Sequence, residues 1–370
     1  MLDRLKRLVS VKGLLALIFL ITLYKFINYE GMEKYIVAAV LCAVYFFLSR
    51  KKKWSAEVFL CVAAPVISYL LIGGISGIFN GSSYMASIKV FIYWLVPLMV
   101  SFALYVYYGK DMDYIIDIQL LSSCVVYGYS VAYILYMGYV WESTFAFAFG
   151  AFAIYYAYKK RWIFLAISLQ FLYWADKRIA MLGVILALLV LVFMWFFKQS
   201  KKLVILIWSM VITGIYAYMY LIYSGTMEYF CWGFDINTNG RAEMYSRVAN
   251  HFKFSLFYPG AGIGVVENLL DNMNVQAFAN LHNDLLKFYI ELGFVGLFVF
   301  LISYIVMFHL AEKLCGKSQM CFLFAMSLYS IVLYATDNVS IYVLYLLPLY
   351  STFFAVLAEN KYTIESKEST

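Results

Sequence analysis

Long runs of apolar residues, separated by short polar turns, make up most of this sequence. A helix that crosses a membrane needs about 20 mainly apolar residues. The runs are continuous and do not alternate between apolar and polar positions, which argues against a transmembrane β-barrel. The pattern predicts an all-α polytopic membrane protein with about twelve transmembrane helices. The expected ranges are 13–28, 35–49, 57–79, 88–108, 115–138, 143–158, 162–175, 179–197, 203–223, 285–309, 320–336 and 340–358.

The composition agrees with a membrane protein. Hydrophobic residues are 65% of the chain and charged residues 13%, whereas a soluble protein has about 45–50% and about 25%. Residues 13–27 follow a basic N-terminal stretch. They lack a small-residue cleavage site, so we expect them to form a retained first span and not a cleaved signal peptide. With no internal repeat and no linker, residues 1–370 are expected to form one integral membrane domain.

The net charge of +7 predicts orientation and not a nucleic-acid partner. The basic residues gather in alternate loops, for example at 50–53, 159–161 and 201–202. Loops on the cytoplasmic side of a membrane carry an excess of Lys and Arg. Both termini are therefore expected in the cytoplasm, with the intervening turns on the outer side.

One connection, residues 224–284, is far longer than the others and is expected on the outer side. Loops beyond about 12–15 residues are usually functional or disordered, and this one is too rich in aromatic residues to be disordered. Residues 241–252 within it have helical spacing of apolar positions, and a second short helix is expected at 265–271. Any chemistry is expected at this large outer loop, between the ninth and tenth spans.

Several polar motifs follow one another in and around this loop. Gly240-Arg241 opens the first predicted helix, Pro259 to Gly264 form a glycine-rich turn, and His282-Asn283 precede the tenth span. Glu291 and a Gly-x-x-Gly sequence at 293–296 follow. In their order and spacing these motifs resemble the O-antigen polymerase and ligase family of bacterial surface-polysaccharide assembly. Arg178 matches the arginine of that family's Ser-Arg motif, but Lys177 stands where the serine is expected.

The resemblance implies a glycosyltransferase of the GT-C type that needs neither a metal nor a cofactor. It would act on the outer face of the bacterial inner membrane, with glycans linked to undecaprenyl pyrophosphate as donor. Membrane lipids and a separate chain-length regulator are the other implied partners.

The candidate residues suit that chemistry. A pyrophosphate leaving group needs fixed positive charge, and arginine presents a planar fork of donors that matches phosphate oxygens. Arg241 and Arg178 are expected to supply it. A histidine that titrates near neutrality suits the base that takes the proton of the acceptor hydroxyl, and His282 is the candidate. The remaining candidates for contact with pyrophosphate or glycan are Asn283, Arg247 and Lys89.

Each candidate also has a purely structural interpretation. His282 could cap the tenth helix, and Arg241 and Arg178 could anchor to lipid headgroups. Arg247 could be a solvated surface charge, and Lys89 could extend its ammonium to the membrane surface. Lys287 carries the same ambiguity, and the deeply placed Glu291 should be paired, because an isolated charge within a membrane is costly.

Two other patterns favour no function. The six cysteines form no Cys-x-x-Cys pair and are expected to be small apolar residues within spans. The Gly-Ala-Gly-Ile-Gly sequence at 260–264 lacks the spacing and the strand–helix context of a dinucleotide site.

Three functions remain open. The first is a polymerase that transfers the growing O-antigen or capsular glycan from its carrier lipid to the next repeat unit. The second is a ligase that transfers finished chains to a lipid A core. The third, of another class, is a transporter or flippase for lipid-linked glycans, but transporters often show internal repeats and polar sites at the membrane midplane, which this sequence lacks.

Overall fold

The structure, a computed structural model, describes residues 55–80, 84–136, 142–235, 240–272 and 281–368 and a few isolated earlier positions. These residues form helices and connecting turns, without strands. The ten principal helices are α4 (Ala56–Asn80), α5 (Tyr84–Tyr108), α6 (Met112–Tyr136), α7 (Phe145–Tyr158), α8 (Trp162–Trp174), α9 (Arg178–Phe196), α10 (Lys201–Tyr223), α14 (Asp284–Cys315), α15 (Lys317–Tyr334) and α16 (Val343–Glu368).

Each of these helices overlaps one of the predicted ranges, but α14 and α16 continue beyond the predicted ends, to Cys315 and Glu368. Apart from isolated positions, the first two predicted ranges lie outside the described residues. By length and composition, five described stretches can cross a membrane: Ala56–Asn80, Ser87–Ala132, Arg178–Phe196, Lys201–Tyr223 and Asp284–Cys315. The helices Phe145–Tyr158, Trp162–Trp174 and Val343–Ala358 are apolar but shorter. The all-α membrane class is therefore supported, and the count of twelve spans stays a prediction.

Aromatic packing joins the helices in the core. Tyr69, Trp94, Phe288 and Phe300 come from three helices, and the ring centroids of Tyr69 and Trp94 lie 4.8 Å apart. Buried rings in tilted and edge-to-face pairs add attraction beyond the apolar area that they bury. Trp208 of α10 also donates from its indole Nε1 to the carbonyl of Leu301, 2.8 Å away, so that α10 is fixed against α14.

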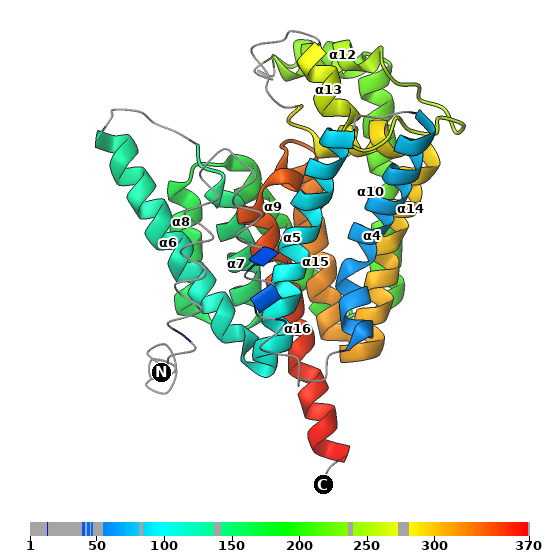
Figure 1. The fold of residues 1–370 in the computed structure, drawn as a ribbon. Coiled ribbons are helices and arrows are strands. Elements are labelled where there is room, and N and C mark those ends of the chain that lie inside the picture. Colours follow the sequence, from blue (N-terminus) through cyan, green and yellow to red (C-terminus); the bar gives the residue numbers. More distant parts are fainter. Residues whose placement is uncertain are drawn as a thin grey trace.

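The long connection folds onto one end of the helix bundle (Figure 1). It contains α11 (Thr226–Gly233), α12 (Arg241–Ala249) and α13 (Val265–Asn272), and the end of α16 projects from the opposite end of the bundle (Figure 1). The two helices predicted within this segment are α12 and α13, although α12 ends three residues earlier than expected. Helix α11 was not predicted.

A break inside α14 receives the glycine-rich turn. Gly293 has φ 76° and ψ −178°, which interrupts the helix. The turn lies against this break: the backbone N–H groups of Ala261 and Gly262 donate to the carbonyls of Ile290 and Glu291, at 2.8 and 3.0 Å. Carbonyls beside the break therefore keep partners in a region where water is scarce.

The short connections complete the chain. A 3₁₀ turn, η1 (Gly109–Asp111), joins α5 to α6, and η2 (Val339–Ile341) follows α15. The segment around η2 lies at the end of the bundle that carries α12, and it supplies part of the candidate site.

Candidate functional site

Arg241 is placed by the first turn of α12. Gly240 precedes it in the left-handed backbone region, with φ 78°, and acts as the N-cap. Tyr245 and Val248, on one face of the helix, are buried and attach α12 to the bundle. The guanidinium Nη1 of Arg241 donates to the carbonyl oxygen of Thr336, 3.0 Å away. This contact uses one of five N–H donors and holds the guanidinium over the turn between α15 and η2.

His282 and Asn283 form the entry to α14. The buried amide of Asn283 caps the helix, because its Oδ1 accepts from the backbone N–H of Leu286 at 2.9 Å. Its Nδ2 donates to the hydroxyl of Tyr218, 2.8 Å away. His282 adopts a positive φ of 51°, and its carbonyl accepts from the hydroxyl of Tyr245 at 3.0 Å. These contacts fix the backbone from which the imidazole projects.

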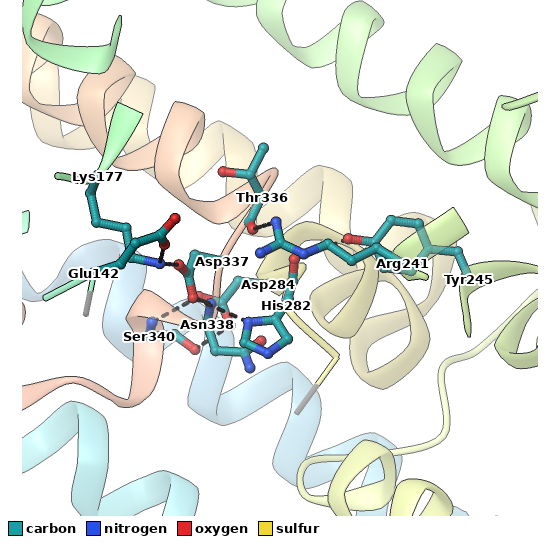
Figure 2. A network of polar contacts seen from close by, with 10 residues as sticks. All are labelled: Glu142, Lys177, Arg241, Tyr245, His282, Asp284, Thr336, Asp337, Asn338 and Ser340. Carbon is teal, nitrogen blue, oxygen red and sulfur yellow. Dashed lines mark hydrogen bonds and ion pairs between the residues drawn. The ribbon is translucent and has the colours of Figure 1, made fainter. Parts of the chain in front are cut away.

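The imidazole of His282 faces a buried carboxylate. Its Nδ1 lies 3.5 Å from Oδ1 of Asp337, while Lys177 reaches Oδ2 of the same carboxylate from the other side, at 3.2 Å. Lys177 also pairs with Glu142 at 2.8 Å. Figure 2 shows Asp337 between the lysine and the imidazole, with Arg241 beside them.

These contacts shift the pKa values of Asp337 and Lys177. Burial by itself would raise the pKa of Asp337, but the hydrogen bond with His282, the charge of Lys177 and the backbone N–H of Asn338 outweigh it and lower that pKa. Burial likewise opposes the charge on Lys177, but Asp337 and Glu142 raise its pKa. At neutral pH the carboxylate is therefore ionised beside an ammonium group.

The turn that carries Asp337 is held in place by the first residue of α14. Asp284, the first residue of α14, is fully buried. Its carboxylate accepts from the backbone N–H of Ser340 at 2.7 Å and from the Ser340 hydroxyl at 2.6 Å. Asp337 itself accepts from the backbone N–H of Asn338 at 2.8 Å (Figure 2). The backbone N–H of Asp284 also donates to the carbonyl of Asp337 at 3.3 Å. Because Asp284 holds the turn both at Asp337 and at Ser340, the carboxylate that faces His282 has little freedom to move.

This arrangement can perform proton transfer beside an anion. A carboxylate that accepts from Nδ1–H leaves Nε2 of a neutral imidazole as the basic nitrogen. The His282 side chain remains 32% exposed and Asp337 only 4%, so the imidazole is open to a ligand while its partner is shielded. Arg241 adds a fixed positive charge on the same turn, suited to a phosphate group.

The structure brings some of the predicted residues together and leaves others apart. His282, Asn283 and Arg241 meet around the turn at 336–337, with Asn283 engaged as the helix cap. Arg178 begins α9 directly after Lys177 and is exposed. Arg247 lies on the surface of α12, where it pairs with Glu243 at 2.6 Å. Lys89 is exposed on α5, a helix that contributes no residue to the His282 cluster.

Four members of the cluster were not predicted from the sequence as site residues: Asp337, Lys177, Glu142 and Tyr245. Asp337 gave one weak signal, since it is a carboxylate in a short turn expected on the same side as the long loop. Lys177 occupies the position of the serine in the family's Ser-Arg motif. That difference from the motif did not indicate that Lys177 forms an ion pair with Asp337.

Lys287 and Glu291 have partners within the protein. The ammonium group of Lys287 pairs with Glu267 of α13. The carboxylate of Glu291 accepts from the Tyr69 hydroxyl at 2.5 Å and from the backbone N–H of Gly264 at 2.8 Å. The structural interpretation of Glu291 is the one that this geometry supports, because the carboxylate ties the glycine-rich turn to α14 and α4.

Comparison with known proteins points in one direction. Neither the curated proteins nor the solved structures contain a significant match to the chain. A family model described as O-antigen ligase matches residues 163–301, a segment that includes Arg178, Arg241 and His282 but ends before Asp337. This family implies a glycosyltransferase-like membrane enzyme of the O-antigen ligase and polymerase type. The resemblance of the sequence motifs to the O-antigen polymerase and ligase family is thereby confirmed.

Proposed function

We propose that this protein is a polymerase of lipid-linked oligosaccharide repeat units, a metal-independent glycosyltransferase with a twelve-span, GT-C-like fold. It acts on the outer face of the bacterial inner membrane, with both termini in the cytoplasm. It transfers the growing O-antigen or capsular glycan from undecaprenyl pyrophosphate to the next repeat unit. The observation that carries the proposal is the pairing of His282 with buried Asp337 directly beside the guanidinium of Arg241.

The reaction uses these residues as follows. The acceptor hydroxyl gives its proton to Nε2 of His282, and its oxygen attacks the anomeric carbon of the donor sugar. The bond between that carbon and the pyrophosphate oxygen breaks, and the pyrophosphate, still attached to its carrier lipid, leaves with the electron pair on that oxygen. Asp337 accepts from Nδ1–H and stabilises the imidazolium that forms, as a carboxylate does for a catalytic histidine in other enzymes.

The leaving group is stabilised by cations. Arg241 meets the pyrophosphate with its guanidinium, and a fixed charge that acts where negative charge develops lowers the barrier. Arg178, exposed next to the Lys177 that contacts Asp337, provides a second cation. Asn283 acts by positioning His282 at the helix entry. Arg247 and Lys89, both exposed, are assigned no step.

A ligase is the second candidate, and the description of the matching family model favours it. The same His–Asp–Arg arrangement would serve, with a lipid A core sugar as acceptor. The two activities differ in the acceptor and not in the chemistry at the anomeric carbon.

The test is the polysaccharide pattern of cells that carry His282→Ala, compared with His251→Ala as a matched control. His251 is an exposed histidine of the same segment. With equal protein in the membranes, collapse of the long-chain ladder to a single repeat unit supports the polymerase. Chains of normal length that stay on the carrier lipid support the ligase instead. If His282→Ala leaves the ladder unchanged, His282 is not the catalytic base, and the transporter becomes the next function to test.

A further inference from the structure

A groove runs along one flank of the bundle between α4 and α14. Its cavity volume is about 390 Å³. The walls are built mainly of apolar side chains, among them Ile72, Ile75, Leu256, Phe257, Val295 and Val299. Two polar side chains also line it, and both are engaged: the Ser76 hydroxyl donates to the carbonyl of Pro259 at 2.9 Å, and the Tyr258 hydroxyl donates to that of Ile290 at 3.0 Å. The groove therefore suits a hydrocarbon ligand.

Hydrogen bonds fix the wall formed by the turn at 256–260. The side-chain amide of Asn80, at the end of α4, donates to the carbonyl of Gly260 at 2.8 Å. On the other side, the backbone N–H of Phe294 donates to the carbonyl of Tyr258 at 3.0 Å, across the break in α14. Because the turn is held on both helices, the groove exists before any ligand arrives, and a ligand would not have to pay the entropy of ordering it.

The groove opens where lipid is expected. Both α4 and α14 are long and apolar enough to cross a membrane. Three of their groove residues are exposed, Ile75 at 55%, Val295 at 53% and Val299 at 44%, and Phe257 of the neighbouring turn is 90% exposed. Apolar surface that continues the lipid-facing sides of two membrane helices is covered by hydrocarbon in the bilayer.

We propose that this groove seats the hydrocarbon chain of the lipid-linked donor, an inference that rests on the proposed function. Leu292 lines the groove, and the nine residues from Asn283 to Leu292 place it roughly 14 Å along α14 from the entry that carries His282. The turn beside the groove belongs to the same segment as α12 and Arg241. A carrier lipid has a single long chain, which suits one groove, and its pyrophosphate then reaches the cations at the end of the bundle.

The experiment uses the full-length protein in lipid nanodiscs and a prenyl pyrophosphate with a photoreactive diazirine in its chain. Peptide mass spectrometry maps the labelled residues. Val299→Trp fills the groove, and Val306→Trp is the matched control: Val306 lies on the same helix with similar exposure, 47% against 44% for Val299, but does not line the groove.

We expect label on residues 256–257 and 295–299, reduced at least fivefold by Val299→Trp and unaffected by Val306→Trp. Unlabelled undecaprenyl pyrophosphate should compete, and a phosphatidylglycerol of equal concentration should not. Label that is insensitive to Val299→Trp, or that phosphatidylglycerol displaces equally, overturns the proposal, and in the second case the groove holds bulk lipid.

The labelling is repeated with His282→Ala, so that the groove and the reaction are judged separately. Normal groove labelling in that variant together with an unchanged polysaccharide ladder refutes the proposed reaction and leaves the groove standing. If His282→Ala abolishes the ladder but the groove is not labelled specifically, the proposed reaction stands and the groove proposal is refuted.

Discussion

The imidazole Nδ1 of His282 lies 3.5 Å from the carboxylate Oδ1 of Asp337, although the two residues are 55 positions apart in the chain. This contact joins the entry of α14 to the turn after α15. It places the imidazole against a buried carboxylate, and in the tautomer that donates from Nδ1 the basic nitrogen is Nε2.

The first prediction concerns that contact. Asp337→Asn keeps the size of the side chain but removes the charge that stabilises an imidazolium, so turnover should fall about 100-fold or more, within the range that acid–base catalysis contributes. The measurement is the rate of glycan transfer by purified enzyme at saturating donor, with KM determined alongside.

Lys177→Met is the comparison for that variant. It removes the other partner of Asp337 and leaves the His–Asp contact in place, so the loss should be clearly smaller than for Asp337→Asn. Equal losses in the two variants would mean that Asp337 serves the ion pair and not the imidazole.

The second prediction concerns stability and pH. The pKa of Asp337 is lowered in the folded protein, whereas an unfolded aspartate has a pKa of about 3.9. A lowered folded pKa contributes stability that is present above the unfolded value and is lost as pH falls through the folded one. The gap in Tm between wild type and Asp337→Asn should therefore narrow as the pH falls from about 5 to below 4.

Thermal unfolding in detergent between those pH values measures this gap. Asp235→Asn removes an exposed carboxylate of the same long segment and controls for the loss of a carboxylate elsewhere. A gap between wild type and Asp337→Asn that widens toward low pH would contradict the linkage.

The apolar runs predicted the helices well, because length and hydropathy are local properties. The range 179–197 became α9 (Arg178–Phe196), for example. The prediction ended α14 at residue 309, but the helix continues to Cys315. There Lys201 of α10 contacts His309 at 2.6 Å and Glu312 at 3.1 Å, so a neighbouring helix supplies partners for the polar last turns, which by their own sequence were interpreted as loop.

The site was predictable only where a motif marked it. Arg241 and His282 stand in recognisable patterns, whereas Asp337 sits in an ordinary polar turn, and its partners Lys177 and His282 are distant in the chain. The two glycine motifs are recognisable in the sequence, but only the three-dimensional structure shows that they contact each other. Pro259 to Gly264 and Gly293 are two halves of one contact, in which the turn satisfies the carbonyls beside the helix break.

The third prediction separates two arginines of α12. Arg241→Lys should lower the transfer rate by about 10- to 100-fold, because an ammonium group does not reproduce the planar fork that binds phosphate oxygens. Arg247→Lys should stay close to wild type, since Arg247 is exposed and paired with Glu243. The transfer assay at several donor concentrations measures both variants, and a loss equal for the two would place pyrophosphate binding elsewhere on the segment.

The last prediction tests the break in α14. A Cβ atom on Gly293 would lie 2.3 Å from the carbonyl oxygen of Tyr258 and 2.4 Å from the backbone nitrogen of Gly260, at a φ of 76°. Backbone cannot yield as a flexible side chain does, so Gly293→Ala should destabilise by more than about 2 kcal/mol. It should also reduce the amount of folded protein in membranes, measured with its Tm.

Gly214→Ala is the matched control for the break. Gly214 lies within α10, and a Cβ atom there meets nothing within 4 Å, so alanine should be neutral or stabilise by up to about 1 kcal/mol. If Gly293→Ala were as stable as Gly214→Ala, the turn would not be locked into the break. The fixed wall of the groove, and with it the preformed seat for a lipid chain, would then lose its structural basis.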